Sequence, residues 1–355
     1  MKKLYICEYP SVLYKTLIER MCDEENSYSL ILSDARADLE PMVPVLRQSG
    51  LFERVEFFSS APYKNYYDIL TSYLPQSLVA RYLKLLKNQL KMALYQKRFK
   101  EINFPFEIDF REYDKIICID HPYVINGYLN MNHIEYAIVE HGKSLYKRST
   151  YPKAAAAYLY AFGILDKLHI LPGIRTASRF CKEVIVDDAT DISYCLHDKK
   201  ITGWSVDEHI NALDSEQKNR IFQLYAEAYG VKIDIGQTYD LLLTNPLFRD
   251  GFLPSEEKQI KLYKDLIRER LISPVLIKPH PRDTVDYKKY FSDCIVIDKS
   301  ISSEILNFSQ DLRLSTVLTV FSSSGPSFRE KAEKVVMLEE FQMAAHQIET
   351  LKPYQ

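Results

Sequence analysis

The sequence predicts an α/β protein made of two Rossmann-like domains that face each other across a cleft. Short apolar runs typical of strands alternate along the chain with amphipathic stretches typical of helices, which is the pattern of βαβ units. This alternation begins at Leu4–Cys7 and begins again at Asp240–Leu243, and Gly230 ends the helical stretch between them. A chain of 355 residues is also too long for one ordinary hydrophobic core. We therefore expect an N-terminal domain over residues 1–230 and a C-terminal domain over 231–355.

Several stretches carry the strand pattern, because they are short, apolar and bounded by turn residues. In the N-terminal half the predicted strands cover residues 4–7, 28–32, 55–58, 115–119, 136–139, 167–170 and 183–186. In the C-terminal half they cover residues 240–243, 275–277, 294–297, 315–320 and 334–338. Helices are expected between them, among others over 11–21, 206–229, 256–270 and 327–332. A last helix over 340–351 is placed so that it can pack back on the first domain.

The composition excludes several classes of protein. The formal net charge is −2 at pH 7, which gives no general attraction for nucleic acid. The six cysteines form no C-x-x-C pair and no zinc spacing, so we expect reduced thiols. The first residues lack the apolar region of a signal peptide, and no apolar run approaches the roughly 20 residues of a membrane span. We therefore expect a cytoplasmic protein with no nucleic-acid partner.

One predicted helix, over residues 76–100, carries seven basic residues and no acidic one. Its apolar positions follow one stripe, and its Lys and Arg side chains follow another. This pattern fits an ordinary solvated helix face. It also fits a face that contacts an anionic glycan or an anionic membrane surface, so peripheral contact with the inner face of the cell membrane is a second interpretation. The sequence is also compatible with a homodimer.

The usual phosphate-binding signatures are absent from the sequence. The chain has ten glycines and contains neither G-x-G-x-x-G nor G-x-x-x-x-G-K-[ST]. An Asp-x-Asp motif, which would hold a nucleotide through a divalent metal, does not occur either. A phosphate ligand would therefore be bound by other groups, and we expect no metal and no cofactor.

Three polar turns follow predicted strands, namely Glu140-His141-Gly142, Lys278-Pro279-His280-Pro281 and Ser322-Ser323-Ser324-Gly325. Open α/β sheets bind ligands outside the carboxyl ends of their strands. Two prolines hold His280 in a turn with little freedom, between the cations Lys278 and Arg282, which suits a phosphate. The serine hydroxyls, with the N–H groups of the helix start that follows, suit the same ligand. Each turn taken alone also fits a purely structural role.

A carboxylate in the N-terminal half completes this set. Glu140 can accept a proton from an attacking hydroxyl, and burial would raise its pKa toward the working range. Gly142 lets a substrate or the backbone come close. Two alternatives are open, because His121-Pro122 repeats the His-Pro dipeptide after another strand, and Asp250 follows the first strand of the C-terminal half as an alternative base.

In this order, Glu140-x-Gly142, Lys278-Pro279-His280-Pro281 and Ser322–Ser324 resemble the acidic-Gly, His-Pro and Ser/Thr motifs of bacterial GT-B sialyltransferases. That group includes lipooligosaccharide sialyltransferases and capsular polysialyltransferases. The likeness consists of three short motifs between residues 140 and 324. One position departs from the family pattern, because His141 stands where the family has a second acidic residue.

The resemblance implies a GT-B glycosyltransferase that moves sialic acid from CMP-sialic acid to a terminal sugar of lipooligosaccharide or capsule, with inversion and without a metal. It implies that Glu140 is the general base and that His280 donates a hydrogen bond or a proton to the departing phosphate. Lys278, Pro281, Gly325 and the three serines would belong to the donor site. The partners would be a nucleotide-sugar donor and a glycan acceptor.

Two other functions are open. The first is another GT-B transferase of wall or capsule assembly that uses a different activated donor. The second is a non-enzymic, nucleotide-binding protein of an assembly complex. Donor screening tests the first, and substitution of Glu140 and His280 tests the second.

Overall fold

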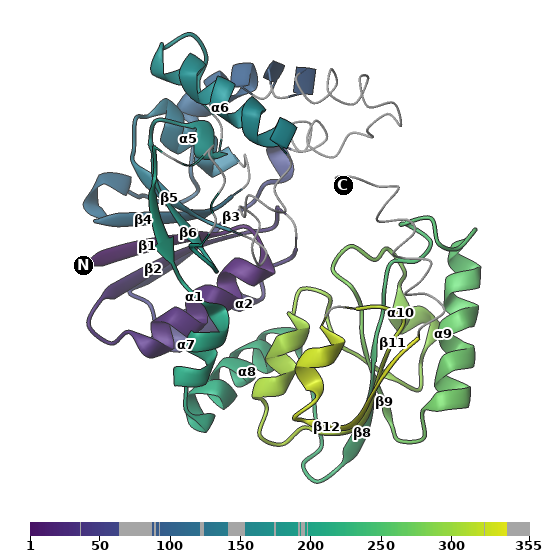
Figure 1. The fold of residues 1–355 in the computed structure, drawn as a ribbon. Helices are drawn as coiled ribbons and strands as arrows, with labels where there is room; N and C mark the ends of the chain where they lie inside the picture. Colours follow the sequence, from purple (N-terminus) through teal and green to yellow (C-terminus); the bar gives the residue numbers. More distant parts are fainter. Residues whose placement is uncertain are drawn as a thin grey trace. The chain divides into compact units, whose positions relative to one another are not determined.

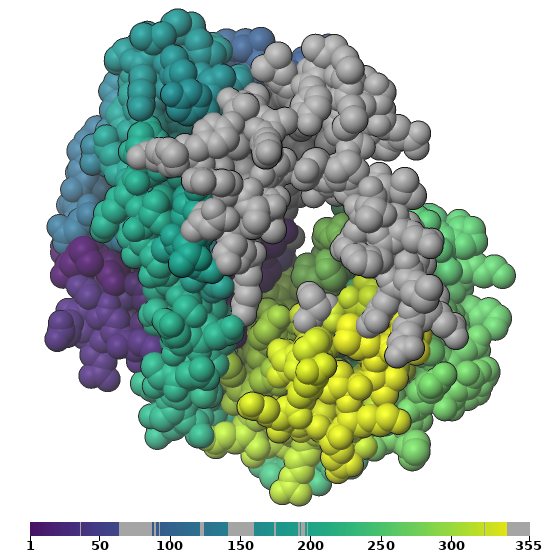
Figure 2. All heavy atoms as spheres, viewed as in Figure 1, coloured from purple at the N-terminus to yellow at the C-terminus, as the bar shows by residue number. Residues whose placement is uncertain are grey.

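A computed structural model describes residues 1–35, 37–63, 87–88, 90–91, 93–120, 124–140, 153–173, 175–190, 192, 196, 198–322 and 324–338, with the backbone alone for 153–159. Figure 1 shows the fold as a ribbon, and Figure 2 shows the same view with all heavy atoms as spheres. Several predicted features lie outside the described residues. They are the basic helix as far as residue 86, the helix over 340–351, and the candidate site residues His121, Pro122, His141, Gly142 and Ser323.

The chain divides into two compact units, Met1–Leu213 and Asp214–Gln355, and each is described by itself. The division precedes helix α8 (Ser215–Tyr229), whereas the sequence placed the domain boundary after it, near residue 230. α8 belongs with the second unit because Gln310 of that unit donates hydrogen bonds to the Asn219 side chain at 3.1 Å and to the Ser215 carbonyl at 2.9 Å.

Unit 1 contains a seven-stranded parallel sheet in the order β3-β2-β1-β4-β5-β6-β7. Its strands are β1 (Lys2–Cys7), β2 (Ser27–Ser33), β3 (Arg54–Phe58), β4 (Lys115–Ile119), β5 (Tyr136–Val139), β6 (Cys181–Val186) and β7 (Lys200–Gly203). The order reverses between β1 and β4, as in Rossmann-type sheets. Its α-helices are α1 (Pro10–Cys22), α2 (Met42–Gln48), α5 (Val124–Met131), α6 (Lys153–Lys167) and α7 (Val206–Ala212), and short 3-10 helices include η2 (Gln96–Glu101) and η4 (Arg175–Ala177).

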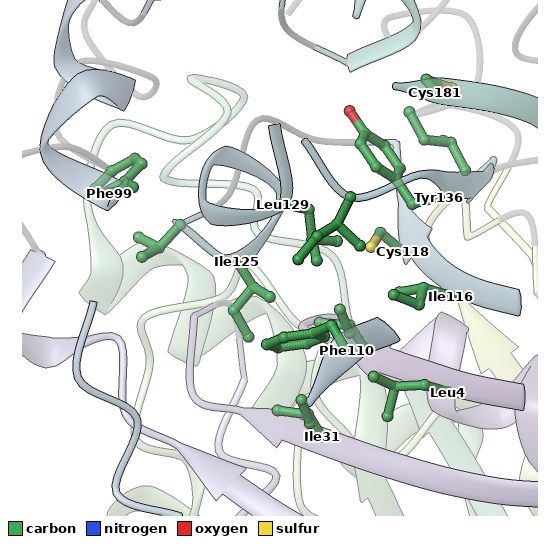
Figure 3. Packing of buried hydrophobic residues seen from close by; sticks show 14 of the residues in the cluster. Leu4, Ile31, Phe99, Phe110, Ile116, Cys118, Ile125, Leu129, Tyr136 and Cys181 are labelled. Atoms are coloured by element: carbon green, nitrogen blue, oxygen red, sulfur yellow. The ribbon is translucent and has the colours of Figure 1, made fainter. Parts of the chain in front are cut away.

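Helices cover both faces of this sheet (Figure 1). α1 lies on the face of Cys7, whose Sγ is 3.7 Å from the Thr16 hydroxyl of that helix. The opposite face carries Leu4 and Cys118, which pack in one apolar cluster with Ile125 of α5 (Figure 3). Because both faces are buried, the central strands are continuous apolar runs, and this is why they are easily found in the sequence.

One strand predicted in the N-terminal half is wrong. Residues 167–170 end helix α6 and enter a turn, where the Ile170 N–H donates to the Leu165 carbonyl at 2.9 Å and His169 has a φ of 58°. The apolar run was misleading because Leu168 and Ile170 are exposed, at 61% and 59%, instead of packing in a sheet.

Unit 2 contains a five-stranded parallel sheet in the order β10-β9-β8-β11-β12. The strands are β8 (Thr238–Leu243), β9 (Val275–Lys278), β10 (Ile295–Val296), β11 (Arg313–Thr319) and β12 (Ala332–Met337). The helices after α8 are α9 (Glu256–Arg270), α10 (Tyr287–Tyr290), and the 3-10 helices η6 (Ser303–Phe308) and η7 (Gly325–Phe328). The helix predicted over 327–332 is wrong, because η7 ends at Phe328 and β12 starts at Ala332.

Local signals explain where α8 starts and ends. The Asp214 side chain accepts the Gln217 N–H at 2.8 Å, and the Gln217 side chain accepts the Asp214 N–H at 3.0 Å, which is a capping box. Gly230 ends the helix with a φ of 64°, so the predicted stop is confirmed. The α/β class with two Rossmann-like sheets is confirmed as well. In the part of the chain that the structure describes, no helix is long and apolar enough to cross a membrane.

Candidate active site

The carboxyl edge of the unit 2 sheet brings polar turns together. β8 lies between β9 and β11, so the turn after β8 lies between the His280 turn and the serine turn. Thr244 Oγ1 accepts the His280 N–H at 3.1 Å, and Asn245 Oδ1 accepts the Phe321 N–H at 3.3 Å. Sequence reasoning missed Thr244 and Asn245. Their position in the sequence could have indicated them. They are short polar residues directly after the first strand of the C-terminal half, and such a strand often lies next to the point where the strand order reverses.

His280 is a neutral ring in a constrained turn. Its carbonyl accepts the Asp283 N–H at 2.9 Å, and its Nδ1 accepts the Arg282 N–H at 3.1 Å. Burial, with the nearby charges of Arg282 and Lys278, lowers the pKa of His280 to about 4. When Nδ1 of a neutral imidazole accepts a hydrogen bond, the proton is on Nε2. His280 therefore has one N–H to donate to a ligand at neutral pH.

Lys278 lies beneath this turn and is buried. Its Nζ donates to the Pro279 carbonyl at 2.6 Å and to the Lys299 carbonyl at 3.4 Å. Burial lowers the pKa of Lys278 to about 8, although the carboxylates of Glu304 and Asp298 oppose this shift. Lys278 thus carries a positive charge at neutral pH, and its hydrogen bonds go to backbone carbonyls of the same edge.

The serine turn follows β11. The Ser324 N–H donates to Ser322 Oγ at 3.3 Å, and Ser324 Oγ donates to Glu304 Oε1 at 3.0 Å. Ser322 accepts in the first of these bonds and so retains a hydroxyl hydrogen to donate. Gly325 suits its position because a Cβ there would lie 3.2 Å from Thr319 Cγ2. The sequence indicated the serines and the glycine but not Glu304, which is 20 residues from Ser324 in the chain.

Asp250, the alternative base, lies beside the His280 turn in unit 2. Arg282 donates to both carboxylate oxygens of Asp250, at 3.0 and 2.9 Å, in a bidentate pair. Arg249 donates to the Arg282 carbonyl at 2.6 Å. Pro281, which is exposed, stands between His280 and Arg282 and holds φ fixed in this segment. Asp250 therefore orients a cation next to His280.

Glu140 lies at the carboxyl edge of unit 1, directly after β5, and is completely buried. Its Oε1 accepts the Asp187 N–H at the end of β6, and its carbonyl accepts Lys15 Nζ at 2.9 Å. Asp120, at the end of β4, pairs with Arg175 at 3.1 and 2.5 Å. Sequence reasoning missed this pair, because its members are 55 residues apart and neither belongs to a motif.

The structure thus brings His280, Ser322, Ser324 and Asp250 to one edge of unit 2, and it places Glu140 at the corresponding edge of unit 1. Within the described residues there is no group of three or more His, Cys, Asp or Glu side chains that could hold a metal ion. The available groups are hydrogen-bond donors and fixed positive charges in unit 2, and carboxyl groups in unit 1.

Two Rossmann-type sheets in one chain are the fold of the GT-B class of glycosyltransferases. The sequence profile of glycosyltransferase family 52 matches residues 85–339. The chain belongs to this family, which is a family of bacterial sialyltransferases. The predicted glycosyltransferase class and the predicted resemblance to bacterial sialyltransferases are confirmed at the level of the family.

Individual relatives are more distant. An uncharacterised protein from Haemophilus influenzae is 34% identical over 134 residues, which are 36% of this chain and 43% of that protein. A Photobacterium phosphoreum α/β-galactoside α-2,3-sialyltransferase aligns over 95% of this chain and 90% of its own, at 14% identity and a TM-score of 0.45. A Methanocaldococcus jannaschii UDP-GlcNAc 2-epimerase aligns over 99% and 94%, at 12% identity and a TM-score of 0.44. Scores of this size carry no argument about chemistry.

Proposed function

We propose that this protein is an inverting, metal-independent sialyltransferase that transfers sialic acid from CMP-sialic acid to a terminal sugar of a cell-surface glycan. The observation that carries the proposal is the state of His280. It is a neutral ring with its proton on Nε2, at an edge that also has the Ser322 hydroxyl and the charges of Lys278 and Arg282. This combination suits a phosphate that leaves with negative charge. Membership of family 52 supports the choice of donor.

In the proposed reaction, a hydroxyl oxygen of the acceptor sugar attacks the anomeric carbon of sialic acid from the side opposite CMP. The bond from that carbon to the phosphate oxygen breaks, and its electron pair leaves with CMP. Glu140 accepts the proton of the attacking hydroxyl, with Asp250 as the alternative base. His280 donates from Nε2 to the departing phosphate oxygen, and Ser322 donates to the same group. A single displacement inverts the configuration.

The charge on the leaving group explains why a metal is not needed in this proposal. Negative charge that develops on a phosphate is stabilised by a divalent ion or by donors that are already in position. Unit 2 has donors that are already in position. Thr244 accepts the backbone N–H of His280, the Arg282 N–H bonds the His280 ring, and Asn245 bonds the start of the serine turn. We therefore expect chelation of divalent metals by EDTA to leave the rate unchanged.

The test is an assay of the purified protein with CMP-sialic acid and, in parallel, with UDP-linked sugars. We expect release of CMP and transfer to one or more members of a panel of methyl glycosides, and we expect His280→Ala to abolish most of both. His209→Ala is the matched control, because this histidine lies on α7 of the other unit and stacks on Trp204 at 4.3 Å. Transfer from a UDP-sugar without any reaction of CMP-sialic acid would overturn the donor assignment. A glycan phenotype in cells that survives both Glu140→Gln and His280→Ala would indicate a non-enzymic role.

The same proposal places the enzyme in the cytoplasm, where acceptor glycans of lipooligosaccharide or capsule are built at the inner face of the cell membrane. The basic segment 76–100 would hold the protein there by attraction to anionic lipids. Co-sedimentation with phosphatidylglycerol vesicles, and not with neutral phosphatidylcholine vesicles, tests this, and sedimentation velocity tests for a homodimer.

A further inference from the structure

Four polar side chains stand at one level on neighbouring strand ends of unit 1. Ile31, Ile6, Cys118 and Ile138 are register partners across β2, β1, β4 and β5, and all four belong to the apolar cluster under α5. Side chains two residues farther along a strand lie on the same face. The residues in that place, which we call the polar row, are Ser33, Glu8, Asp120 and Glu140.

The polar row is completely buried, with no exposed surface on any of its four members. Burial raises the pKa of the Cys118 thiol well above its usual range, and the nearby Glu8 carboxyl raises it further, as it does for Cys7. The alternation of side chains along β1 assigns Glu8 to the face of the apolar cluster. The row also crosses the gap between β1 and β4, where the strand order reverses and where open α/β sheets bind their ligands.

Two members of the polar row have protein partners. Asp120 is paired with Arg175, and Glu140 accepts the Asp187 N–H. The other two members are different, because both carboxyl oxygens of Glu8 and the hydroxyl of Ser33 have no hydrogen-bond partner among the described residues. An unpaired buried polar group destabilises a folded protein, so two such groups on neighbouring strands need a reason.

The charges around Glu8 decide which kind of ligand suits it. An anion would meet the carboxyl groups of Asp120 and Glu140 in the same row. A cation would need Glu8 to be ionised, and burial opposes this by raising the pKa of Glu8 well above its usual range. A neutral carboxylic acid donates one hydrogen bond and accepts others, as a serine hydroxyl does. The fitting ligand is therefore an uncharged polyol, of which a sugar ring is the relevant case.

We infer that Glu8 and Ser33 bind hydroxyl groups of the acceptor sugar and so position it in unit 1, an inference that rests on the proposed glycosyltransferase function. Glu8 and Glu140 are two strand spacings apart, roughly 10 Å. A mono- or disaccharide can span this distance, with its reacting hydroxyl at Glu140 and another hydroxyl at Glu8. Because Glu8 has no exposed surface, acceptor binding must involve a local movement at this edge.

The test compares three variants with the wild type in transfer kinetics. Glu8→Leu removes both the donor and the acceptor, and we expect the acceptor KM to rise about tenfold while the affinity for CMP, a ligand of unit 2, is unchanged. Glu8→Gln keeps a donor and an acceptor, so the KM should stay within about threefold. Thr16→Val is the control, because Thr16 is equally buried but lies on the opposite face of the sheet. It should leave the acceptor KM unchanged.

A melting temperature measured for each variant separates the possible outcomes. If Glu8→Leu raises the melting temperature and leaves the acceptor KM as in the wild type, Glu8 is a buried acid without a ligand and the inference is wrong. If the wild type does not use CMP-sialic acid at all, the proposed function fails first. The variants are then compared by the thermal shift that methyl glycosides produce, and a shift that survives Glu8→Leu, or no shift in the wild type, overturns the inference.

Discussion

The two sheets of this protein have the same topology at their strand ends but opposite chemistry there. The edge of unit 2 is rich in positive charge and donors, through Lys278, His280 and Arg282, and its turns are tied to one another by side chains. The edge of unit 1 is rich in carboxyl groups, of which Glu8 and Glu140 are the two that the proposals use. The carboxyl edge of a Rossmann-type sheet is thus a general ligand-binding position, and the side chains at the strand ends decide which ligand binds there.

The difference extends to how the polar groups are satisfied. In unit 2 the residues directly after β8 bond both neighbouring turns, so the donors are held in position before a ligand arrives. In unit 1 part of the polar row is without a partner among the described residues. Preorganised donors, as in unit 2, suit a reaction in which negative charge must be stabilised as it develops. Unpaired polar groups, as in unit 1, suit the binding of a neutral ligand that completes their hydrogen bonds.

The largest effect is expected for His280→Ala, which removes the proposed hydrogen-bond donor to the leaving phosphate in unit 2. We expect kcat to fall by about 10²–10³, with the acceptor KM unchanged, because the role of His280 is limited to the donor phosphate. The pKa of about 4 also predicts that kcat/KM for the donor has no His280 titration near pH 6.5. A pH profile with a clear break there, lost in the variant, would contradict this description of the ring.

A comparison of Glu140→Gln with Asp250→Asn tests which unit has the base. If Glu140 is the base, its substitution lowers kcat by about 10²-fold or more and leaves CMP binding intact. Asp250→Asn would instead leave Arg282 without its bidentate partner. We expect mainly a higher KM for the donor, by about tenfold or less. The reverse pattern in steady-state kinetics would move the base to unit 2.

Gly325→Ala tests how closely the serine turn is packed. The new Cβ would lie 3.2 Å from Thr319 Cγ2, so the turn or β11 must shift by a few tenths of an ångström. We expect a loss of about 1–3 kcal/mol in the free energy of unfolding and a higher KM for the donor. Gly50→Ala is a matched control for a glycine with no atom within 4 Å of the added Cβ, although its φ of +70° adds strain of its own. Equal loss of donor affinity in both variants would exclude a local effect at the serine turn.

The prediction with the smallest expected effect on activity concerns Glu8 and the stability of the fold. Because the pKa of Glu8 is raised in the folded protein, the unfolded chain loses this proton at lower pH than the folded one. Stability is therefore highest below the ordinary Glu pKa and falls as pH rises from there toward the folded pKa. Glu8→Gln should remove this fall, by up to about 1.4 kcal/mol per pH unit over that range. Urea unfolding at several pH values measures it, and a wild type that instead gains stability relative to the variant with rising pH would show that Glu8 is ionised in the fold.

Much of the fold could be predicted from the sequence because buried parallel strands are continuous apolar runs. All strands of both sheets except β7 were found in this way; β7 was missed because Lys200–Gly203 is not an apolar run. The failure at residues 167–170 arises because an apolar helix end resembles a short strand. The boundary between the units was placed after α8 because a glycine stop is a local signal. The hydrogen bonds of Gln310 that attach α8 to unit 2 are between residues far apart in the sequence.

The candidate site divides in the same way. The sequence by itself determined the residues that follow strands, among them Glu140, His280 and Ser322, because a residue directly after a parallel strand lies at the carboxyl edge wherever the strand lies in the sheet. Only the tertiary structure decided what these residues contact. Strand order places Thr244 against His280 and aligns Glu8 with Glu140 on one level of the sheet. The physical reason is that strand order and register bring together residues that are distant in the chain, and no local pattern records which strands become neighbours.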